Sequence, residues 1–171
     1  IQLYQEAANH QIGEAYLELG NIYFKGEYIN KNVEEAFRCY NAVTEKNSYS
    51  SETISYAKCN LAYMYQFGFG TNSDLLKAAK IYQEADDNNG SSACNYARMV
   101  QQHDFLDTVE NVVTWYEKAV DKSNTRAMYN LALMYIKGDG VEHNYEKAVS
   151  LLNQALEKQS PQAQLLMAIA Y

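Results

Sequence analysis

Residues 127–152 read AMYNLALMYIKGDGVEHNYEKAVSLL, and residues 57–82 read AKCNLAYMYQFGFGTNSDLLKAAKIY. In both stretches apolar residues recur three and four positions apart, a glycine-containing turn follows, and the helical spacing then begins again. Glycine ends a helix at low cost because it accepts a left-handed backbone, and a short polar residue such as Asp74 or Asn144 suits the start of the next helix. Each stretch therefore predicts two helices joined by a turn.

This helix–turn–helix pair recurs along most of the chain. We expect the first helices of the pairs over 15–23, 57–65, 92–100, 127–135 and 163–171, and second helices around 4–8, 36–40, 78–82, 112–116 and 148–152. Leu61 to Tyr96 and Tyr96 to Leu131 are each 35 residues apart, but Leu19 to Leu61 spans 42, which implies an insertion of about seven residues. A period of this length is typical of stacked helical repeats.

The repeats predict a single array over 1–171. Its expected parts are a second helix of a preceding repeat at 1–13, repeat 1 at 14–55 with an inserted loop at 47–55, repeat 2 at 56–90, a degenerate repeat 3 at 91–125, repeat 4 at 126–161 and a half repeat at 162–171. The turn of the third repeat, at 101–105, lacks both glycines, so we expect an irregular corner there.

The repeated residues resemble a known family. An Ala-x-x-x-Leu-Gly-x-x-Tyr segment, as at 15–23, followed by Gly-x-Gly and a Lys-Ala-x-x-x-Tyr helix, as at 77–82, is similar to the Sel-1-like repeat, a relative of the tetratricopeptide repeat. The resemblance covers nearly the whole chain. It implies an all-α fold, an α/α solenoid wound as a right-handed superhelix.

The resemblance also implies a function. Similar proteins act as adaptors in membrane-protein degradation at the endoplasmic reticulum, in cell-wall synthesis control and in bacterial host interaction, so we expect an adaptor, scaffold or inhibitor that binds a protein partner. The same likeness leans toward an exported, periplasmic or endoplasmic-reticulum lumenal setting. Members linked to β-lactam binding carry a regular cysteine pair in each repeat, which this chain lacks. We therefore expect no enzymatic activity and no cofactor.

In tetratricopeptide-type arrays the first helices line a concave groove. By that resemblance the groove-facing residues here are Asn21, Tyr56, Tyr63, Arg98, Arg126, Tyr129 and Leu133. Tyr and Arg are residue types that often carry interface energy, so Tyr63, Arg98 and Tyr129 form the hypothetical contact row. The alternative is that these are ordinary solvated or partly packed side chains.

The two ends of the sequence leave repeats incomplete. The chain begins with a second helix and ends with a first helix, so apolar residues such as Leu165, Met167 and Ile169 are expected to be exposed. Either the chain is a fragment of a longer array, or a partner or a second copy of the chain covers the ends. The second explanation is the alternative function, a structural module that forms a homodimer.

Composition excludes other classes of protein. The 171 residues include 21 acidic and 14 basic side chains, for a net charge of −7, whereas phosphate recognition needs clustered Lys and Arg. We therefore expect no nucleic-acid partner. The single proline favours helices over a sandwich or barrel, and no apolar run reaches the roughly 20 residues of a membrane span.

The cysteines and histidines of the sequence do not indicate a catalytic or metal site. Cys39, Cys59 and Cys94 fall at core positions of expected helices and are interpreted as buried free thiols, with a Cys39–Cys59 bridge as the alternative. The histidines show no metal-ligand spacing to another ligand type, so we expect no metal; they are His10, His103 and His143. Trp115 occupies the core position of its repeat.

Overall fold

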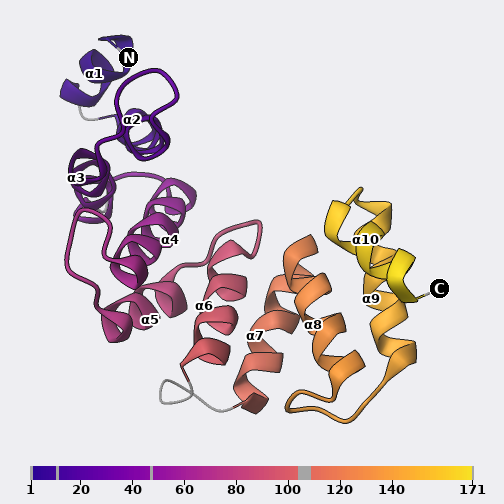
Figure 1. Cartoon of the computed structure of the whole chain (residues 1–171). Helices are drawn as coiled ribbons and strands as arrows, with labels where there is room; N and C mark the ends of the chain where they lie inside the picture. The colour runs from indigo at the N-terminus through magenta and orange to yellow at the C-terminus, as the bar shows by residue number, and fades with distance from the viewer. Residues whose placement is uncertain (1, 11, 47, 104–108, 171) are drawn as a thin grey trace. The chain divides into compact units, whose positions relative to one another are not determined.

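The structure, a computed structural model, describes residues 2–10, 12–46, 48–103 and 109–170, with side chains for all of these except 9, 109, 110 and 168–170. Ten α-helices lie in these ranges, and no strand occurs within them (Figure 1). The chain divides into two units, Ile1–Asp87 and Asn88–Tyr171, each of which is described by itself.

Five of the described helices belong to each unit. The first unit contains α1 (Gln2–Asn9), α2 (Gly13–Lys25), α3 (Val33–Thr44), α4 (Ser51–Phe67) and α5 (Leu75–Glu84). The second contains α6 (Ser91–Gln102), α7 (Val109–Asp121), α8 (Thr125–Lys137), α9 (Tyr145–Glu157) and α10 (Pro161–Ala170). Even-numbered helices are the predicted first helices of the pairs, and odd-numbered helices are the second ones.

The predicted turn residues act as helix caps. The side chains of the three polar residues accept hydrogen bonds from backbone N–H groups three residues later, which satisfies donors at the helix start; the three are Asn32, Asp74 and Asn144. Three glycines end the preceding helices in the left-handed conformation, with φ between 67° and 75°; they are Gly26, Gly68 and Gly138.

A further hydrogen bond closes each of these turns. The backbone N–H of the capping residue donates to the carbonyl of the tyrosine near the end of the preceding helix. The pairs are Asn32 to Tyr23 at 2.9 Å, Asp74 to Tyr65 at 2.9 Å and Asn144 to Tyr135 at 3.0 Å. The start of each second helix is therefore tied to the end of its own first helix.

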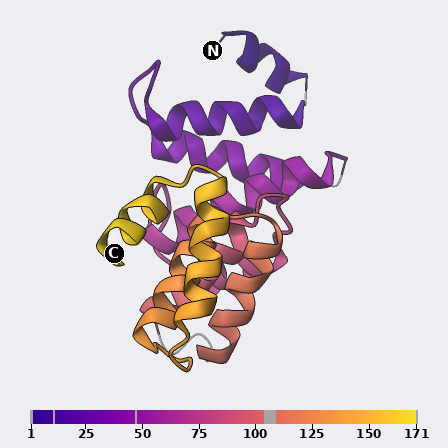
Figure 2. The same cartoon turned by 90° about the vertical axis from the view of Figure 1, so that its right-hand side faces the viewer.

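Gly20 allows α2 and α3 to pack closely, and Figure 2 shows these helices side by side. A Cβ atom built on Gly20 would lie 2.5 Å from Cε1 of Tyr40, which is closer than real Cβ contacts. Tyr40 is buried, with 2% of its surface exposed. The sequence predicted a small residue at the middle of the first helix. Gly20 fills that role, because the Tyr40 ring of α3 occupies the space where a larger side chain would lie.

Tyrosines of the second helices also bond to their first helices. The hydroxyl groups donate to side-chain oxygens of polar residues; the pairs are Tyr40 to Asn21 at 2.8 Å, Tyr82 to Gln66 at 3.2 Å and Tyr116 to Gln101 at 2.6 Å. A buried hydroxyl needs such a partner. Burial raises the pKa of Tyr40 and of Tyr116 well above the ordinary value, so both rings stay neutral.

The insertion in the first repeat differs from the loop expected over 47–55. Residues 51–55 are helical and form the start of α4, where the Ser50 hydroxyl accepts from the Thr53 N–H at 3.1 Å. The Thr53 hydroxyl in turn donates to Glu14 of α2 at 2.9 Å. The Ser/Thr-rich stretch thus forms an extra length of helix, which Ser50 caps locally and which the Thr53–Glu14 hydrogen bond joins to α2.

Two further expectations concern the third repeat. Of the predicted irregular corner at 101–105, residues 104 and 105 lie outside the described residues. Trp115 is only half-buried, so its assignment to the core is wrong in part. Its ring contacts Tyr96 edge-on, with 4.9 Å between the ring centroids, and the Lys118 ammonium lies 4.7 Å from the Trp115 ring centroid.

Candidate interaction surface

The residues predicted to face the groove are all accessible to some degree. Asn21, Tyr56 and Tyr63 in the first unit are half-buried, and so are Arg98, Tyr129 and Leu133 in the second, while Arg126 is exposed. The predicted contact row divides between the units, because Tyr63 belongs to the first and Arg98 and Tyr129 belong to the second. Their common role as a row stays a prediction.

Tyr63 lies in a group of four aromatic rings, which we call the ring cluster: Phe24, Tyr63, Phe67 and Phe69. Tyr63 is 4.6 Å from Phe67, 6.0 Å from Phe69 and 6.1 Å from Phe24, measured between ring centroids. Phe67 keeps 46% of its surface exposed, and the other three rings are half-buried. Aromatic pairs at these separations attract one another and hold a rigid apolar surface open to solvent.

A lysine completes this surface. The Lys31 ammonium lies 5.1 Å from the ring centroid of Phe24 and 5.6 Å from that of Phe69. A cation over the face of an aromatic ring is attracted by the ring's quadrupole. The ammonium of Lys31 therefore adds a positive charge over the faces of Phe24 and Phe69.

Three of the four rings were not predicted as site residues, although the sequence held a signal for two of them. In the first and fourth repeats the residues that flank the turn glycine are charged, as in Lys25-Gly26-Glu27 and Lys137-Gly138-Asp139. In the second repeat the same positions are Phe67 and Phe69. The second repeat therefore places two phenylalanines where the first and fourth repeats place charged residues at the turn.

Asn21 has a structural role besides its exposure. Its side-chain oxygen accepts from the Tyr40 hydroxyl at 2.8 Å and lies 3.4 Å from the Asn60 amide nitrogen. It also lines a pocket of about 580 Å³ on α1, α2 and the turn that follows, together with Tyr4, Glu18, Ile22, Lys25, Glu27 and Tyr28. The residue thus links α2 to α3 and α4 while one side meets solvent.

In the second unit the two arginines differ. Arg126 donates from a terminal guanidinium nitrogen to the Asn95 side chain at 2.8 Å, which joins α8 to α6. Arg98 is half-buried on α6, and its charge acts near the buried hydroxyl of Tyr116. Both arginines therefore take part in the packing of their unit as well as presenting charge to solvent.

Of the three apolar residues expected to be exposed near the C-terminal end, the structure describes the side chains of two. Leu165 is exposed over 65% of its surface and Met167 is half-buried, both on α10. The side chain of Ile169 lies outside the described residues. Leu165 thus offers apolar surface, and a role in self-association stays a prediction.

The cysteines have the features of packing residues. Cys39, Cys59 and Cys94 are free thiols and all are buried, so the interpretation as buried free thiols is confirmed and the Cys39–Cys59 bridge is absent from this structure. Burial, and after it the Glu35 charge, raises the pKa of the Cys39 thiol to about 11. A thiol that holds its proton so firmly is a poor nucleophile.

Paired helices with glycine-ended turns and tyrosine contacts define an all-helical repeat protein of the tetratricopeptide-like class. The Sel1 repeat family model matches residues 13–46, 55–87 and 125–160, more than half of the chain. The chain belongs to the Sel1 repeat family, as its sequence predicts. The matches leave out 88–124, the stretch that holds most of the repeat expected to be degenerate.

Relatives support the same assignment. A Sel1-like repeat-containing protein of Schizosaccharomyces pombe is 29% identical over 90 residues, which is 53% of this chain and 13% of the yeast protein. The chain thus spans a small part of that relative.

Solved structures share the fold. A Sel1 repeat protein from Oxalobacter formigenes superposes with a TM-score of 0.81 at 23% identity and covers 98% of this chain and 70% of its own. A protective antigen of uropathogenic Escherichia coli with an SLR fold reaches 0.78 at 23% identity, over 99% of this chain and 36% of its own. The predicted all-α solenoid fold is confirmed.

Membership of the Sel1 repeat family indicates a general kind of function. Sel1 repeat proteins are generally protein-interaction modules, built as helical scaffolds that are typically not enzymes. Among the helices that the structure describes, none combines the length and the apolar character needed to cross a membrane.

Proposed function

We propose that this chain binds a protein partner through the exposed faces of its first helices and acts as an adaptor, scaffold or inhibitor. The observation that carries the proposal is the ring cluster, in which four aromatic side chains from α2, α4 and the following turn stay open to solvent. Aromatic residues are enriched in the energetic centres of interfaces, where they supply large contact area at low entropic cost.

The half-buried residues of the same helices extend this surface within each unit. Tyr56 shares α4 with Tyr63, and Tyr129 shares α8 with Leu133 and the exposed Arg126. Such a mixture of aromatic, aliphatic and guanidinium groups suits an extended protein segment. Self-association through the apolar surface of α10, including Leu165, is the rival, because that side chain is largely exposed.

Photo-crosslinking tests the proposal. A benzophenone amino acid at position 67 is expected to capture a specific protein from lysate of the native host, whereas the same group at position 145, where the tyrosine is 65% exposed on α9, captures far less. Alanine at Tyr63, Arg98 and Tyr129 together is expected to reduce capture without loss of helical circular dichroism.

The rival functions give other results. Equal capture at positions 67 and 145, or no protein enriched at 67, contradicts binding at the ring cluster. Crosslinks only to the chain itself, lost when Leu165 is replaced by Ser and accompanied by a concentration-dependent mass in ultracentrifugation, would establish the homodimer.

A further inference from the structure

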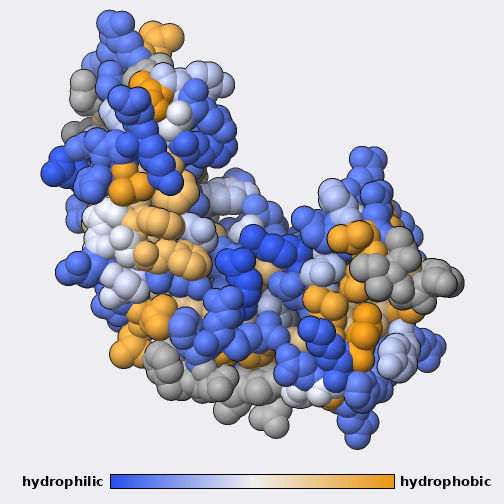
Figure 3. All heavy atoms as spheres, viewed as in Figure 1, coloured by the Kyte–Doolittle hydropathy of each residue, from blue (hydrophilic) through white to orange (hydrophobic). Residues whose placement is uncertain are grey.

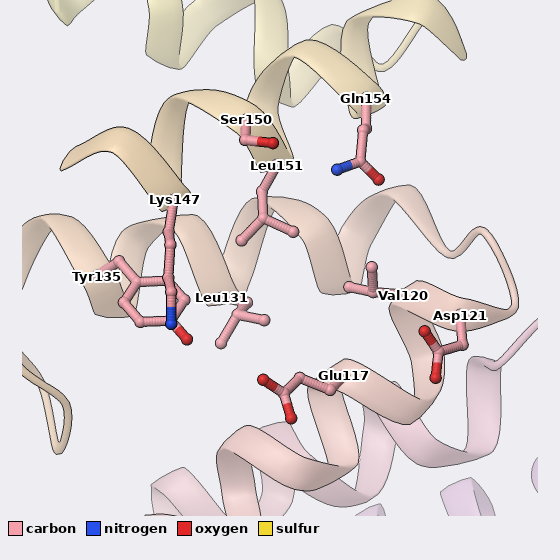
Figure 4. Close-up of a pocket in the computed structure, with 9 residues that line it drawn as sticks. All are labelled: Glu117, Val120, Asp121, Leu131, Tyr135, Lys147, Ser150, Leu151 and Gln154. Atoms are coloured by element: carbon pink, nitrogen blue, oxygen red, sulfur yellow. The ribbon is translucent and has the colours of Figure 1, made fainter. Parts of the chain in front are cut away.

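A groove on the second unit is lined by none of the predicted contact residues or rings of the ring cluster. It has a volume of about 420 Å³ and is lined from α7 by Glu117, Val120 and Asp121, from α8 by Leu131 and Tyr135, and from α9 by Lys147, Ser150, Leu151 and Gln154. Figure 4 shows the α7 and α9 side chains facing one another, with the α8 residues between them. Two successive second helices thus form its walls, and the first helix between them forms its floor.

The floor of the groove is apolar. Leu131 and Leu151 are buried at 2% and 9% exposure, and Val120 extends the aliphatic surface toward the end of α7. Tyr135 adds the face of an aromatic ring. A floor of this kind suits the methylene stem of a long side chain whose charged end stays at the rim.

The rim carries carboxylates on one side and neutral acceptors on the other. Glu117 and Asp121 stand one turn apart on α7, and neither takes part in an ion pair within the described part of the chain. Ser150 and Gln154 contribute a hydroxyl and an amide from α9. The lysine of the lining, Lys147, has its ammonium 5.2 Å from the Tyr135 ring centroid, at the far end from Asp121 (Figure 4).

The corresponding positions of the first unit carry different charges. When the repeats are aligned, Asn41 and Glu45 replace Glu117 and Asp121, and the Asn41 amide donates to Glu45 at 2.6 Å. Lys80 stands at the place of Ser150. Glu84 stands at the place of Gln154, and Lys77 at that of Lys147. The first-unit rim therefore pairs its acids with two lysines, whereas the second unit places both acids on one wall and keeps a single lysine at the far end.

We propose that this groove receives an arginine side chain of a protein segment. The aliphatic stem lies on Leu131 and Leu151, and the guanidinium reaches the carboxylates of Glu117 and Asp121 with the Gln154 amide oxygen opposite. Arginine matches this rim because its planar group offers five N–H donors in several directions. The inference goes beyond the ring cluster, since it assigns a second surface and a basic partner segment.

A titration with a small probe tests the groove directly. Nα-acetyl-arginine amide added to the isotopically labelled chain of 171 residues is expected to shift backbone amide resonances of α7, α8 and α9, whereas the uncharged isostere Nα-acetyl-citrulline amide is not. Glu117→Gln with Asp121→Asn is expected to weaken binding about tenfold, because each carboxylate loses a charge-assisted hydrogen bond.

Two further variants separate the groove from net charge. Ser150→Lys, which copies the first unit's Lys80, is expected to block the probe while α7 keeps its acids. Asp139→Asn with Glu142→Gln removes the same two charges from the exposed turn before α9 and is expected to leave affinity within twofold of the parent chain.

Three results would overturn the proposal: no shifts with the arginine probe, equal shifts with the citrulline probe, or equal loss of binding in the turn variant. None of these bears on capture at the ring cluster, because the probe experiment contains no partner protein. A failure of the groove and a failure of the proposed function are therefore distinguishable.

Discussion

Gly20 and Tyr40 form the most closely fitted contact described between two helices of the first unit. The ring occupies the volume into which any side chain at position 20 would project. Alanine favours a helix over glycine by about 1 kcal/mol, so helix propensity alone predicts that Gly20→Ala stabilises the protein. The contact with Tyr40 predicts the opposite.

We expect Gly20→Ala to lower the free energy of unfolding by about 1–3 kcal/mol, since overpacking forces the helices apart. Urea denaturation followed by circular dichroism measures the change. In a Tyr40→Leu background the smaller side chain leaves room, and the same substitution is expected to cost less. An equal cost in both backgrounds would show that the ring is not the cause.

The Cys39 thiol predicts a loss of stability at alkaline pH. In the unfolded chain its pKa is close to 9.0, whereas in the folded protein burial and the Glu35 charge hold the pKa at about 11. Between these values the unfolded state binds fewer protons than the folded state, so the free energy of unfolding falls as pH rises, and the contribution is complete below pH 9.

The measurement is the urea midpoint from pH 8 to pH 10, a range that ends at 10.0, the ordinary pKa that Tyr40 and Tyr116 have in the unfolded chain and above which their ionisation adds to the loss of stability. The Cys39→Ala variant is expected to lose less stability than the parent chain over this interval. A parallel decline in the two proteins would assign the alkaline effect to other groups.

At the scale of single elements, the capping residues decide where the second helices begin. The Asn144 side chain accepts from the Lys147 N–H at 2.9 Å, and alanine at position 144 would remove that acceptor. Asn144→Ala is expected to cost about 1 kcal/mol of the free energy of unfolding. Asn153→Ala, at an exposed position inside α9, is the control and is expected to be neutral or slightly stabilising. A larger loss at 153 than at 144 would contradict the capping role.

These elements were predictable because their causes are local. Helical spacing, the glycine turns and the capping side chains all act within a few residues, so the sequence predicted the helix pairs and their caps. The extension of α4 was missed because a Ser/Thr-rich stretch is typical of a loop, whereas here the Ser50 side chain caps a helix and the Thr53 hydroxyl bonds to Glu14. Trp115 was misplaced because equivalence between repeats says which face a residue occupies and not how much its neighbours cover.

The candidate site shows the same limit. Tyr63 was predicted from its position on the first helix, and its exposure agrees with that position. The ring cluster was not predicted, because Phe24 belongs to α2 whereas the other rings follow in and after α4. The groove between α7 and α9 was missed because the analogy with tetratricopeptide arrays directs attention to the first helices.

At the scale of the whole molecule, we expect a destabilising substitution to affect its own repeat and the adjacent repeats most. In repeat proteins the free energy is roughly a sum over repeats and the interfaces between successive ones. Leu61 in the first unit and Leu131 in the second occupy equivalent buried positions, with 5% and 2% exposure. The two residues therefore provide matched sites at which to weaken one unit at a time.

We expect Leu131→Ala to cost about 2–5 kcal/mol and to lower hydrogen-exchange protection in α8 and α9 more than in α2 and α3. Leu61→Ala is expected to produce the reverse pattern. Mass spectrometry of peptides after exchange resolves the helices. A uniform loss of protection along the chain in both variants would mean that the described units unfold as one cooperative body.

The hydrogen bond that closes each turn has a consequence for how such chains grow. Because Asn32, Asp74 and Asn144 each bond back to a tyrosine of their own helix pair, the turn is complete within one pair. A gene duplication whose ends fall between pairs therefore copies a unit that already closes itself, whereas a break inside the turn separates the donor from its acceptor. Natural variation in repeat number should accordingly proceed by whole pairs, with boundaries that fall after a second helix.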